Sequence, residues 1–408
     1  MTTMSNQSYF EAAMRTADWM ERNQVKNVGD DANTGRFLAY YYPGRNVPPQ
    51  YTHNWTTGVC IFGQLAAYHR TGEKKYLDAA LRGGGYLTSL QILDERRRDF
   101  FGALKEVTPF SYFCYPRDAL TGAWAMAWLY EETKDLDWKY RARVFADWFL
   151  EIAMQRGWPA WDFRFEHPEE VGFEIDFREG NFHGGSAGFF YDYARITHDT
   201  TRLDRGLRFI ADYLLMRFLG ADGKFKVLYD PAIGEYRDDE DSAHSMVGYK
   251  RMHMFNDDFA CIGLLGAYCY YGDPVYLERA EAHARWLMSE QRADGGFGVP
   301  AVPVASATAP ILLLDLFKLT GKTEYHDAAH RAGQHLLSMQ YVNEDDPKGS
   351  GGFFGLDDAN YDGNDVHKVL NIRDGGYALL ALLKLEGKMN VPYYSVFDRD
   401  GDVGLRRG

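Results

Sequence analysis

Cysteine is scarce in this chain, with four residues in 408. Four cysteines do not make a disulfide framework in a chain of this length, and no pair has the Cys-x-x-Cys spacing of a zinc site. Cys261 and Cys269 lie eight residues apart in one apolar stretch, which is typical of small core side chains. The sequence therefore argues against a disulfide scaffold and a cysteine-based metal site, and we expect no metal and no cofactor.

Positive charge is also in short supply. The 45 Lys and Arg residues are outnumbered by 58 Asp and Glu residues, which gives a formal net charge of -13. Phosphate backbones are bound by clustered cations, and the one basic run, Arg96–Arg98, is short. We therefore expect no nucleic-acid partner. A local group of arginines can still bind an anionic sugar, because net charge does not set the charge of one cleft.

An N-terminal leader and long apolar runs are missing as well. The segment Met1–Trp19 has neither a basic start nor an apolar signal core, and no run approaches the length needed to span a membrane. We therefore expect a cytoplasmic protein with no membrane partner. The alternative is a protein from which a leader has been removed.

The chain contains instead a repeated helical pattern. Residues Phe255–Phe297 predict an apolar helix opened by two aspartates, a Gly-Asp-Pro turn, an amphipathic helix and a glycine-rich exit. Similar hairpins recur around Thr71-Gly72 and Thr320-Gly321. Helical periodicity predicts about twelve helices: Tyr9–Arg22, Thr57–His69, Lys75–Gln91, Ala119–Glu132, Trp138–Gln155, Ser186–Ile196, Thr201–Phe218, Phe259–Tyr271, Val275–Gln291, Thr308–Leu319, Glu324–Gln340 and Tyr377–Glu386.

The predicted helices are of two kinds that alternate along the chain. One kind is short and rich in Gly, Ala and aromatic residues, as in a helix buried on all sides, and the other carries charged residues along one side. We predict an all-α fold, an (α/α)6 barrel with six inner and six outer helices and minor β-hairpins in its loops. Residues 1–408 form this single domain, with 389–408 as a C-terminal tail. Asp294–Phe297 and Gly351–Phe354 are expected to be turns after outer helices.

The long loops all run from the end of an outer helix to the start of an inner one, so they must emerge on one face of the barrel. Helix dipoles and free N–H groups favour negative charge there. The segments that precede the inner helices are rich in charged residues, His and Trp: Tyr51–Trp55, Cys114–Asp118, Arg178–His183, His253–Asp258, Pro303–Ser306 and Asn371–Asp374. Asp and Asn are also ordinary helix N-caps, but capping does not explain the accompanying Arg, His and Trp residues. We expect these segments to form one active site.

Carboxylates that face one another across a pocket can divide acid and base roles when burial raises the pKa of one, as glycosidic cleavage requires. Asp118 is the leading candidate for the general acid/base. Asp258 or Asp257 is second, because adjacent like charges push one of the pair toward protonation. The predicted catalytic residues are Asp118, Asp258, Asp257, His183 and Glu179.

Aromatic rings and arginines are the expected substrate-binding groups. Aromatic residues make up 15% of the chain, and Trp and Tyr rings either stack on sugar faces or simply fill the core. Arg117 and Arg373 either grip a substrate carboxylate or pair with the aspartates that follow them. The predicted substrate-binding residues are Tyr51, His53, Trp55, Tyr115, Arg117, Trp158, Trp161, His253, Arg373 and Asp374.

One stretch resembles a known family. Asn54-Trp-Thr-Thr-Gly-Val-Cys-Ile-Phe-Gly63, followed by Tyr76-Leu-Asp-Ala-Ala80, is similar to the second hairpin of unsaturated uronyl hydrolases. These are (α/α)6 barrels that process uronic-acid oligosaccharides. Arg117-Asp118 stands where they carry a His-Asp pair, which implies that Asp118 matches a functional aspartate. The chain departs from the family at Phe182-His183, where those enzymes have a second catalytic aspartate.

The segment around Asp257-Asp258 departs from that family too, because Asn256, Asp257 and Asp258 replace its Trp-Arg-Gly-Gln helix start. Together with Tyr268 and Tyr276, this segment is similar to the paired-aspartate helix of α-mannanase-type barrels and to sugar 2-epimerase relatives. The resemblance covers nearly the whole chain as architecture.

We predict a glycoside hydrolase that cleaves an oligosaccharide containing uronic acid. A polysaccharide lyase or a sugar epimerase acting on uronates is the alternative, because Tyr51, His53 and His253 supply groups able to abstract a proton. A non-catalytic carbohydrate-binding toroid is the second alternative. The expected partner is the oligosaccharide, and a homo-oligomer stays open.

Overall fold

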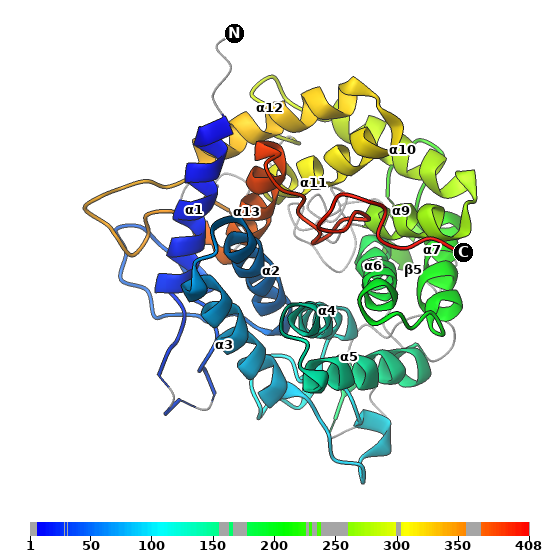
Figure 1. Ribbon diagram of the computed structural model, residues 1–408, viewed down its shortest axis with the longest axis horizontal. Coiled ribbons are helices and arrows are strands. Elements are labelled where there is room, and N and C mark those ends of the chain that lie inside the picture. Colours follow the sequence, from blue (N-terminus) through cyan, green and yellow to red (C-terminus); the bar gives the residue numbers. More distant parts are fainter. Residues whose placement is uncertain are drawn as a thin grey trace.

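The computed structural model describes residues 6–27, 29–30, 32–154, 163–165, 178–225, 228–230, 235–237, 260–298, 303–355 and 369–407, and the statements below refer to these. Its helices form two concentric rings (Figure 1). The inner helices are α2 (Asn54–Thr71), α4 (Pro116–Thr133), α6 (Gly180–Thr197), α9 (Ala260–Tyr271), α11 (Pro303–Thr320) and α13 (Ile372–Glu386). The outer helices are α1 (Asn6–Arg22), α3 (Lys74–Leu90), α5 (Leu136–Trp148), α7 (Phe209–Arg217), α10 (Pro274–Ser289) and α12 (Thr323–Met339). The predicted (α/α)6 barrel is confirmed.

The two rings differ in composition as the sequence predicted. All eight residues at the start of α9, Ala260–Ala267, are buried, whereas outer helices such as α3 bury one side only. Inner helices pack on their neighbours: α2 on α4, α4 on α6, α6 on α9, α11 on α13 and α13 on α2. The outer helices α5 and α7 each include a π-helical turn, Phe149–Ala153 and Asp204–Arg208.

Inner helices begin earlier than their apolar periodicity predicted. α2 begins at Asn54 rather than Thr57, and α4 begins at Pro116 rather than Ala119. The polar residues thought to precede these helices therefore occupy their first turns. The periodicity missed those turns because they carry polar side chains at the end of the barrel and not the apolar pattern of the core.

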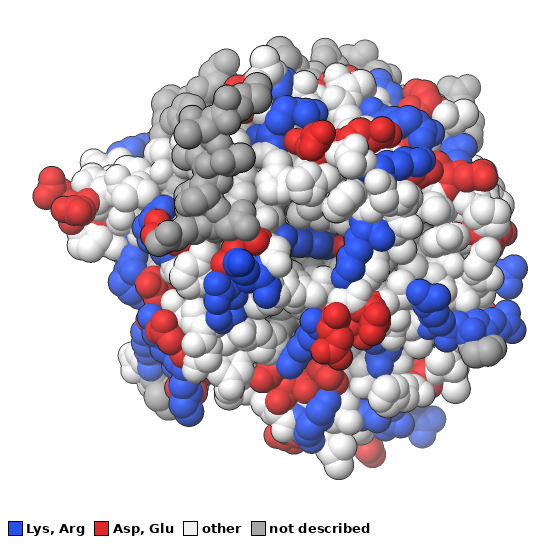
Figure 2. All heavy atoms as spheres, turned by 45° about the horizontal axis from the view of Figure 1, so that its top comes forward, with Lys and Arg blue, Asp and Glu red and all other residues white. Residues whose placement is uncertain are grey.

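One inner helix, α11, is long and apolar enough to cross a membrane by length and composition, and 72% of it is buried inside the protein. Such burial is typical of the core helix of a toroid. On the face shown in Figure 2, Lys and Arg side chains are interspersed with Asp and Glu. The acidic excess of the chain therefore does not gather into one field on that face.

A repeated contact ties an outer helix to the next at four places in the described residues. The side chain of Gln91, which follows α3, donates hydrogen bonds to the carbonyls of Gly102 (3.1 Å) and Arg141 (3.0 Å), and Arg141 of α5 donates one back to Gln91. We call this arrangement the Gln–Gly clasp. It recurs as Gln24–Gly35, Gln291–Gly295 and Gln340–Gly351, with Arg82, Arg331 and Arg15 as the returning arginines.

The clasp has a variant after α7, where Leu219 stands in place of glutamine. There the Arg279 side chain donates to the Leu219 and Gly220 carbonyls, and His283 Nδ1 donates to the Gly223 carbonyl at 2.9 Å. The glycine turns at Asp294–Phe297 and Gly351–Phe354 belong to this series, so they are the turns after outer helices that the sequence predicted.

Short antiparallel strands lie in the loops, as predicted. β1 (Tyr40–Tyr41) pairs with β7 (Leu370–Asn371), and this pairing joins the first loop of the chain to the last. β2 (Phe113–Cys114) pairs with β3 (Phe163–Arg164). The third sheet has the order β4 (Arg178–Glu179), β5 (Leu228–Asp230) and β6 (Glu235–Arg237).

The segment after α13 crosses the interior of the ring (Figure 1). The Tyr394 ring lies 5.1 Å from Trp124 and the Tyr393 ring 4.8 Å from Trp128, both on α4. Asp315 of α11 accepts hydrogen bonds from Ser395 Oγ and from the backbone N–H of Val396, each 3.0 Å long. Because these contacts involve the middle and C-terminal parts of the inner helices, the segment closes the barrel at the end where those helices finish.

Candidate active site

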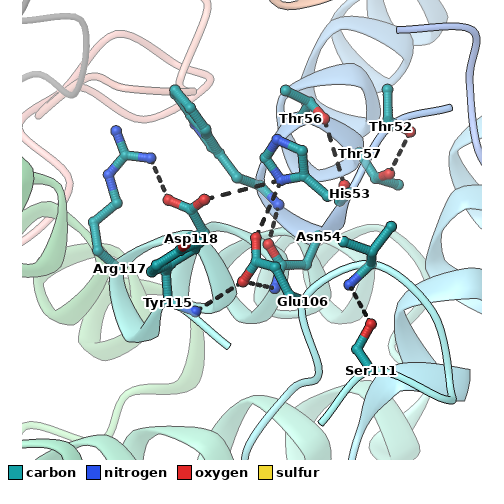
Figure 3. A network of polar contacts seen from close by, with 12 residues as sticks. Thr52, His53, Asn54, Thr56, Thr57, Glu106, Ser111, Tyr115, Arg117 and Asp118 are labelled. Carbon is teal, nitrogen blue, oxygen red and sulfur yellow. Dashed lines mark hydrogen bonds and ion pairs between the residues drawn. The ribbon is translucent and has the colours of Figure 1, made fainter. Parts of the chain in front are cut away.

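The described part of the site is built at the opposite end, where α2 and α4 begin (Figure 3). His53 is the N-cap residue of α2 and has an extended backbone. Asp118 lies in the first turn of α4, which Pro116 opens with a φ angle already suited to a helix. Glu106 comes from the loop between α3 and α4, just before β2. Two helix starts and one loop therefore bring three titratable side chains together.

The three side chains converge on one point. His53 Nδ1 lies 3.5 Å from Glu106 Oε1 and 4.0 Å from Asp118 Oδ2. Each carboxyl is held from behind by its other oxygen: Glu106 Oε2 accepts the backbone N–H of Tyr115 at 2.8 Å and the amide of Asn54 at 3.3 Å. Asp118 Oδ1 accepts from the Arg117 guanidinium. These contacts fix the orientation of both carboxyls toward His53 (Figure 3).

The pKa of Glu106 is strongly shifted by its surroundings. The residue is 3% exposed, and burial raises its pKa well above the ordinary value. The neighbouring Asp118 raises that pKa further through its negative charge and a side-chain hydrogen bond, whereas the hydrogen bonds from Tyr115 and Asn54 act in the other direction. Glu106 therefore keeps its proton to a higher pH than an ordinary glutamate, beside an Asp118 carboxylate that is paired with Arg117.

Trp55 lies between two arginines next to this group. The Arg117 guanidinium is 3.8 Å from the centre of the Trp55 ring, and that of Arg373 is 5.2 Å away. Arg373 is 1% exposed and donates to Asp374 Oδ1 at 3.3 Å. Both arginines thus pair with the aspartate that follows them, one of the two arrangements the sequence left open.

His53, Glu106 and Asp118 are also the set that could hold a metal ion in the described part of the chain. Each offers one ligand atom, and these atoms lie within 4.8 Å of one another. A divalent cation needs ionised carboxylates as ligands. Burial raises the pKa of Glu106, so an ion bound here would have to displace the Glu106 proton.

The other predicted residues fall into two groups. Tyr51 lies near the site, where the Arg36 guanidinium sits 5.7 Å from its ring, and Tyr115 is the N-cap residue of α4. Glu179 and His183 are placed only by their backbone, in β4 and in the first turn of α6. The remaining predicted site residues lie outside the described residues: Asp257, Asp258, His253, Trp158 and Trp161.

Glu106 is a site residue that the sequence did not predict. The predicted site residues stand directly before inner helices, whereas Glu106 lies ten positions before the start of α4 at Pro116, in a segment without a recognised motif. Only the return of the loop through the pairing of β2 with β3 and the Tyr115–Glu106 hydrogen bond brings it under α2. No local signal in the sequence marks that return.

Comparison with known proteins shows likeness in structure but not in sequence. No protein-family model matches the chain, and no curated protein matches it. A cellobiose 2-epimerase from Bacillus thermoamylovorans B4167 superposes with a TM-score of 0.68 at 13% identity, covering 94% of this chain and 100% of that one. An unsaturated glucuronyl hydrolase from Bacillus sp. GL1 gives 0.63 at 18% identity, with 92% and 96% covered.

The GH76A α-1,6-mannanase from Salegentibacter sp. HEL1_6 gives a TM-score of 0.58 at 15% identity, covering 93% of this chain and 99% of that one. The expected resemblance to six-hairpin barrel enzymes is therefore confirmed at the level of the fold. At these identities the likeness shows the fold alone, and the reaction has to be argued from the site.

Proposed function

We propose that the protein is a glycoside hydrolase acting on an oligosaccharide that contains uronic acid, with Asp118 as the general acid/base. The observation that carries the proposal is the convergence of two carboxyls on His53, in which burial and the charge of Asp118 raise the pKa of Glu106. Glycosidic cleavage needs a carboxyl group that can deliver a proton near neutral pH. A carboxyl with a raised pKa beside a second carboxyl supplies such a proton.

The two carboxyls have different access to a substrate. The Asp118 side chain is 14% exposed and that of Glu106 only 4%. Asp118 is therefore the group that meets the substrate, and Glu106 is a positioning residue that interacts electrostatically with it. His53 lies across from both and completes the described part of the site. A second catalytic group at Asp257, Asp258 or His183 stays a prediction.

The start of α4 supports an anionic sugar as substrate. The N-terminus of this helix favours negative charge, and the Arg117 there is already paired with Asp118. The Trp55 ring beside it offers a flat apolar face, as rings that stack on sugars do. An uronate residue presents both features, a carboxylate and a ring with apolar faces.

A lyase or epimerase acting on uronates is the second candidate, and the position of His53 favours it. The His53 side chain is 31% exposed, and its Nδ1 faces two carboxyl groups. Such a histidine can serve as the base that abstracts a carbon-bound proton. Ultraviolet absorbance of the conjugated double bond distinguishes the three candidate reactions. A lyase increases this absorbance, an unsaturated-uronyl hydrolase decreases it, and an epimerase leaves it unchanged.

The proposal is tested with unsaturated uronyl disaccharides prepared by lyase digestion of uronate polysaccharides. We expect the wild type to consume the ultraviolet absorbance and Asp118→Asn to lower kcat by about 100-fold or more, because general acid/base catalysis typically contributes that much. Asp137→Asn, at an exposed position in the first turn of α5, is the matched control and should keep full activity. Full activity of Asp118→Asn with an intact fold would overturn the assignment.

A further inference from the structure

A short hairpin beside the site exposes two aromatic rings. Phe110 is 79% exposed and Tyr112 is 52% exposed, in the loop that runs from α3 to α4. Phe110 is the most exposed of the large hydrophobic side chains in the described residues. Leaving such a ring in water forgoes about 1.5–3 kcal/mol that its burial would contribute. Exposed rings grouped in this way mark a surface that binds something.

The rings are held by an ordered backbone. Ser111 Oγ accepts hydrogen bonds from the backbone N–H groups of Val107 (3.3 Å) and Thr108 (3.0 Å), and the Glu106 N–H donates to the Phe113 carbonyl at 3.0 Å. The Tyr86 hydroxyl donates to the Val107 carbonyl at 2.7 Å. The tip of the hairpin, Phe110–Tyr112, is therefore presented in a fixed position, and little ordering entropy remains to be lost when a ligand binds.

The hairpin links this tip directly to the catalytic pair. Its rings continue inward from Tyr112 to Phe113 (5.4 Å between centroids) and from Phe113 to Tyr115 (5.5 Å). The Tyr115 N–H donates to Glu106, which forms the base of the hairpin. At about 3.3 Å per residue of extended chain, Phe110 can lie no more than about 13 Å from Glu106.

The closed end of the barrel decides which way a bound chain can extend. Tyr393 and Tyr394 fill the axis between the C-terminal parts of the inner helices, so a chain held at Asp118 cannot pass through. It must leave at the end where the inner helices begin, and the exposed hairpin lies at that end. A sugar residue beyond those held at Asp118 therefore emerges at the same end of the barrel as the hairpin.

We propose that Phe110 and Tyr112 form an accessory site that stacks on a sugar ring beyond the two rings that flank the scissile bond at Asp118. This inference rests on the proposed function and extends it to the length of the substrate. Aromatic rings bind sugars through the apolar ring faces, with about 0.5–1.5 kcal/mol from each well-placed ring contact. The site therefore selects oligosaccharides longer than a disaccharide.

The test compares uronate disaccharide and tetrasaccharide binding by titration calorimetry, with the wild-type hairpin and with the Phe110→Ala/Tyr112→Ala double variant, both in an Asp118→Asn background that binds the sugars with little cleavage. We expect the protein with the wild-type hairpin to bind the tetrasaccharide about tenfold more tightly than the disaccharide, and the variant to lose most of that preference with the disaccharide affinity unchanged. Phe209→Ala is the matched control, since Phe209 is also exposed but opens the outer helix α7. It should behave as the wild type.

Each other outcome overturns the accessory site. Equal affinity of the wild-type hairpin for both sugars, binding of neither sugar, or an unchanged preference in the double variant would contradict it. Sedimentation of the same proteins tests whether a second copy of the chain binds the two rings instead of a sugar. A dimer that dissociates in the double variant would assign the rings to that second copy. Failure of the proposed reaction is detected separately, in the turnover of the disaccharide by the wild type and by Asp118→Asn.

Discussion

At the scale of one residue, the raised pKa of Glu106 gives the site a carboxyl that keeps its proton, and it lowers the stability of the folded protein at neutral pH. Its folded-state pKa lies above the ordinary value of 4.5, so between these two values the folded protein holds a proton that the unfolded chain has released. Stability therefore falls as the pH rises through this interval and levels off above the folded-state pKa. A neutral side chain of the same shape, such as glutamine, does not lose folding stability as the pH rises.

We accordingly expect Glu106→Gln to raise the free energy of unfolding near pH 8, by about 1.4 kcal/mol for each unit by which the folded-state pKa of Glu106 exceeds its ordinary value. Near pH 4 the gain should vanish, because Glu106 is then protonated in both states. Activity should fall in the same variant, because Asp118 loses the titratable carboxyl beside it. Chemical denaturation at the two pH values measures the first effect, and disaccharide turnover measures the second.

Glu132 provides a control of opposite sign. The hydrogen bond from His69 is the main cause that lowers the pKa of Glu132 to about 2, with a further contribution from Arg399. Its contribution to stability is present above the ordinary pKa and is lost as the pH falls toward about 2. Glu132→Gln should therefore destabilise the protein at neutral pH. A loss of stability in both variants near pH 8 would contradict the burial argument for Glu106.

At this scale the sequence predicted part of the described site. His53, Trp55, Arg117 and Asp118 were predicted as site residues because polar side chains stand out at the start of an apolar helix, and the structure brings these four together. Glu106 was missed because its place depends on how a loop folds back. A long-range backbone contact of this kind leaves no periodic pattern in the chain.

At the scale of the elements, the Gln–Gly clasp shows why particular glycines end the outer hairpins. Gly102 has a positive φ of 101°, and a Cβ at this position would lie 2.2 Å from the Val144 carbonyl oxygen of the next outer helix. Gly35, Gly223 and Gly295 have the same close approach of 2.2 Å to a backbone carbonyl, and Gly351 has 2.4 Å. The turn therefore lets neighbouring outer helices pack directly on it.

Gly102→Ala should destabilise the protein by at least about 2 kcal/mol, because it combines a left-handed backbone with a clash against an immobile carbonyl. Gly85→Ala is the matched control: Gly85 lies inside α3, and a Cβ added there would meet no neighbouring atom within 4 Å. That substitution should stabilise the helix by about 0.5–1 kcal/mol. Thermal unfolding of both variants measures the difference, and equal melting temperatures would refute the packing role of Gly102.

The sequence predicted the helices and their alternation, because apolar periodicity and the Thr-Gly turns are local features. It indicated the turns at Asp294–Phe297 and Gly351–Phe354 but not the ring that they belong to. The partners of Gln340 show why: they are Ala12, Arg15, Thr16 and Gly351, and three of these lie more than 320 positions away. Such a contact joins the two ends of the chain, so it cannot be predicted from local sequence and forms only when the barrel closes.

At the scale of the whole molecule, the C-terminal tail is part of the core. The sequence predicted 389–408 as a tail outside the helices, and the structure places its residues Tyr393–Phe397 among the most buried of the chain. The Phe62 ring stacks on Tyr393 at 5.4 Å, and Asp315 is shared between Lys384 of α13 and Ser395 of the tail. The last segment therefore completes the inner layer instead of lying on its surface.

Deletion of residues 389–408 should consequently lower the melting temperature sharply and expose apolar surface, because the inner faces of α2, α4 and α13 lose their aromatic partners. Loss of two buried aromatic side chains alone costs about 3–5 kcal/mol each in a packed core. Deletion of residues 406–408 is the matched control, since Arg406 and Arg407 are exposed. Binding of a hydrophobic dye and thermal unfolding distinguish the two truncations. If both keep the stability of the full chain, the tail does not close the barrel, and a bound sugar chain is then free to extend through either end.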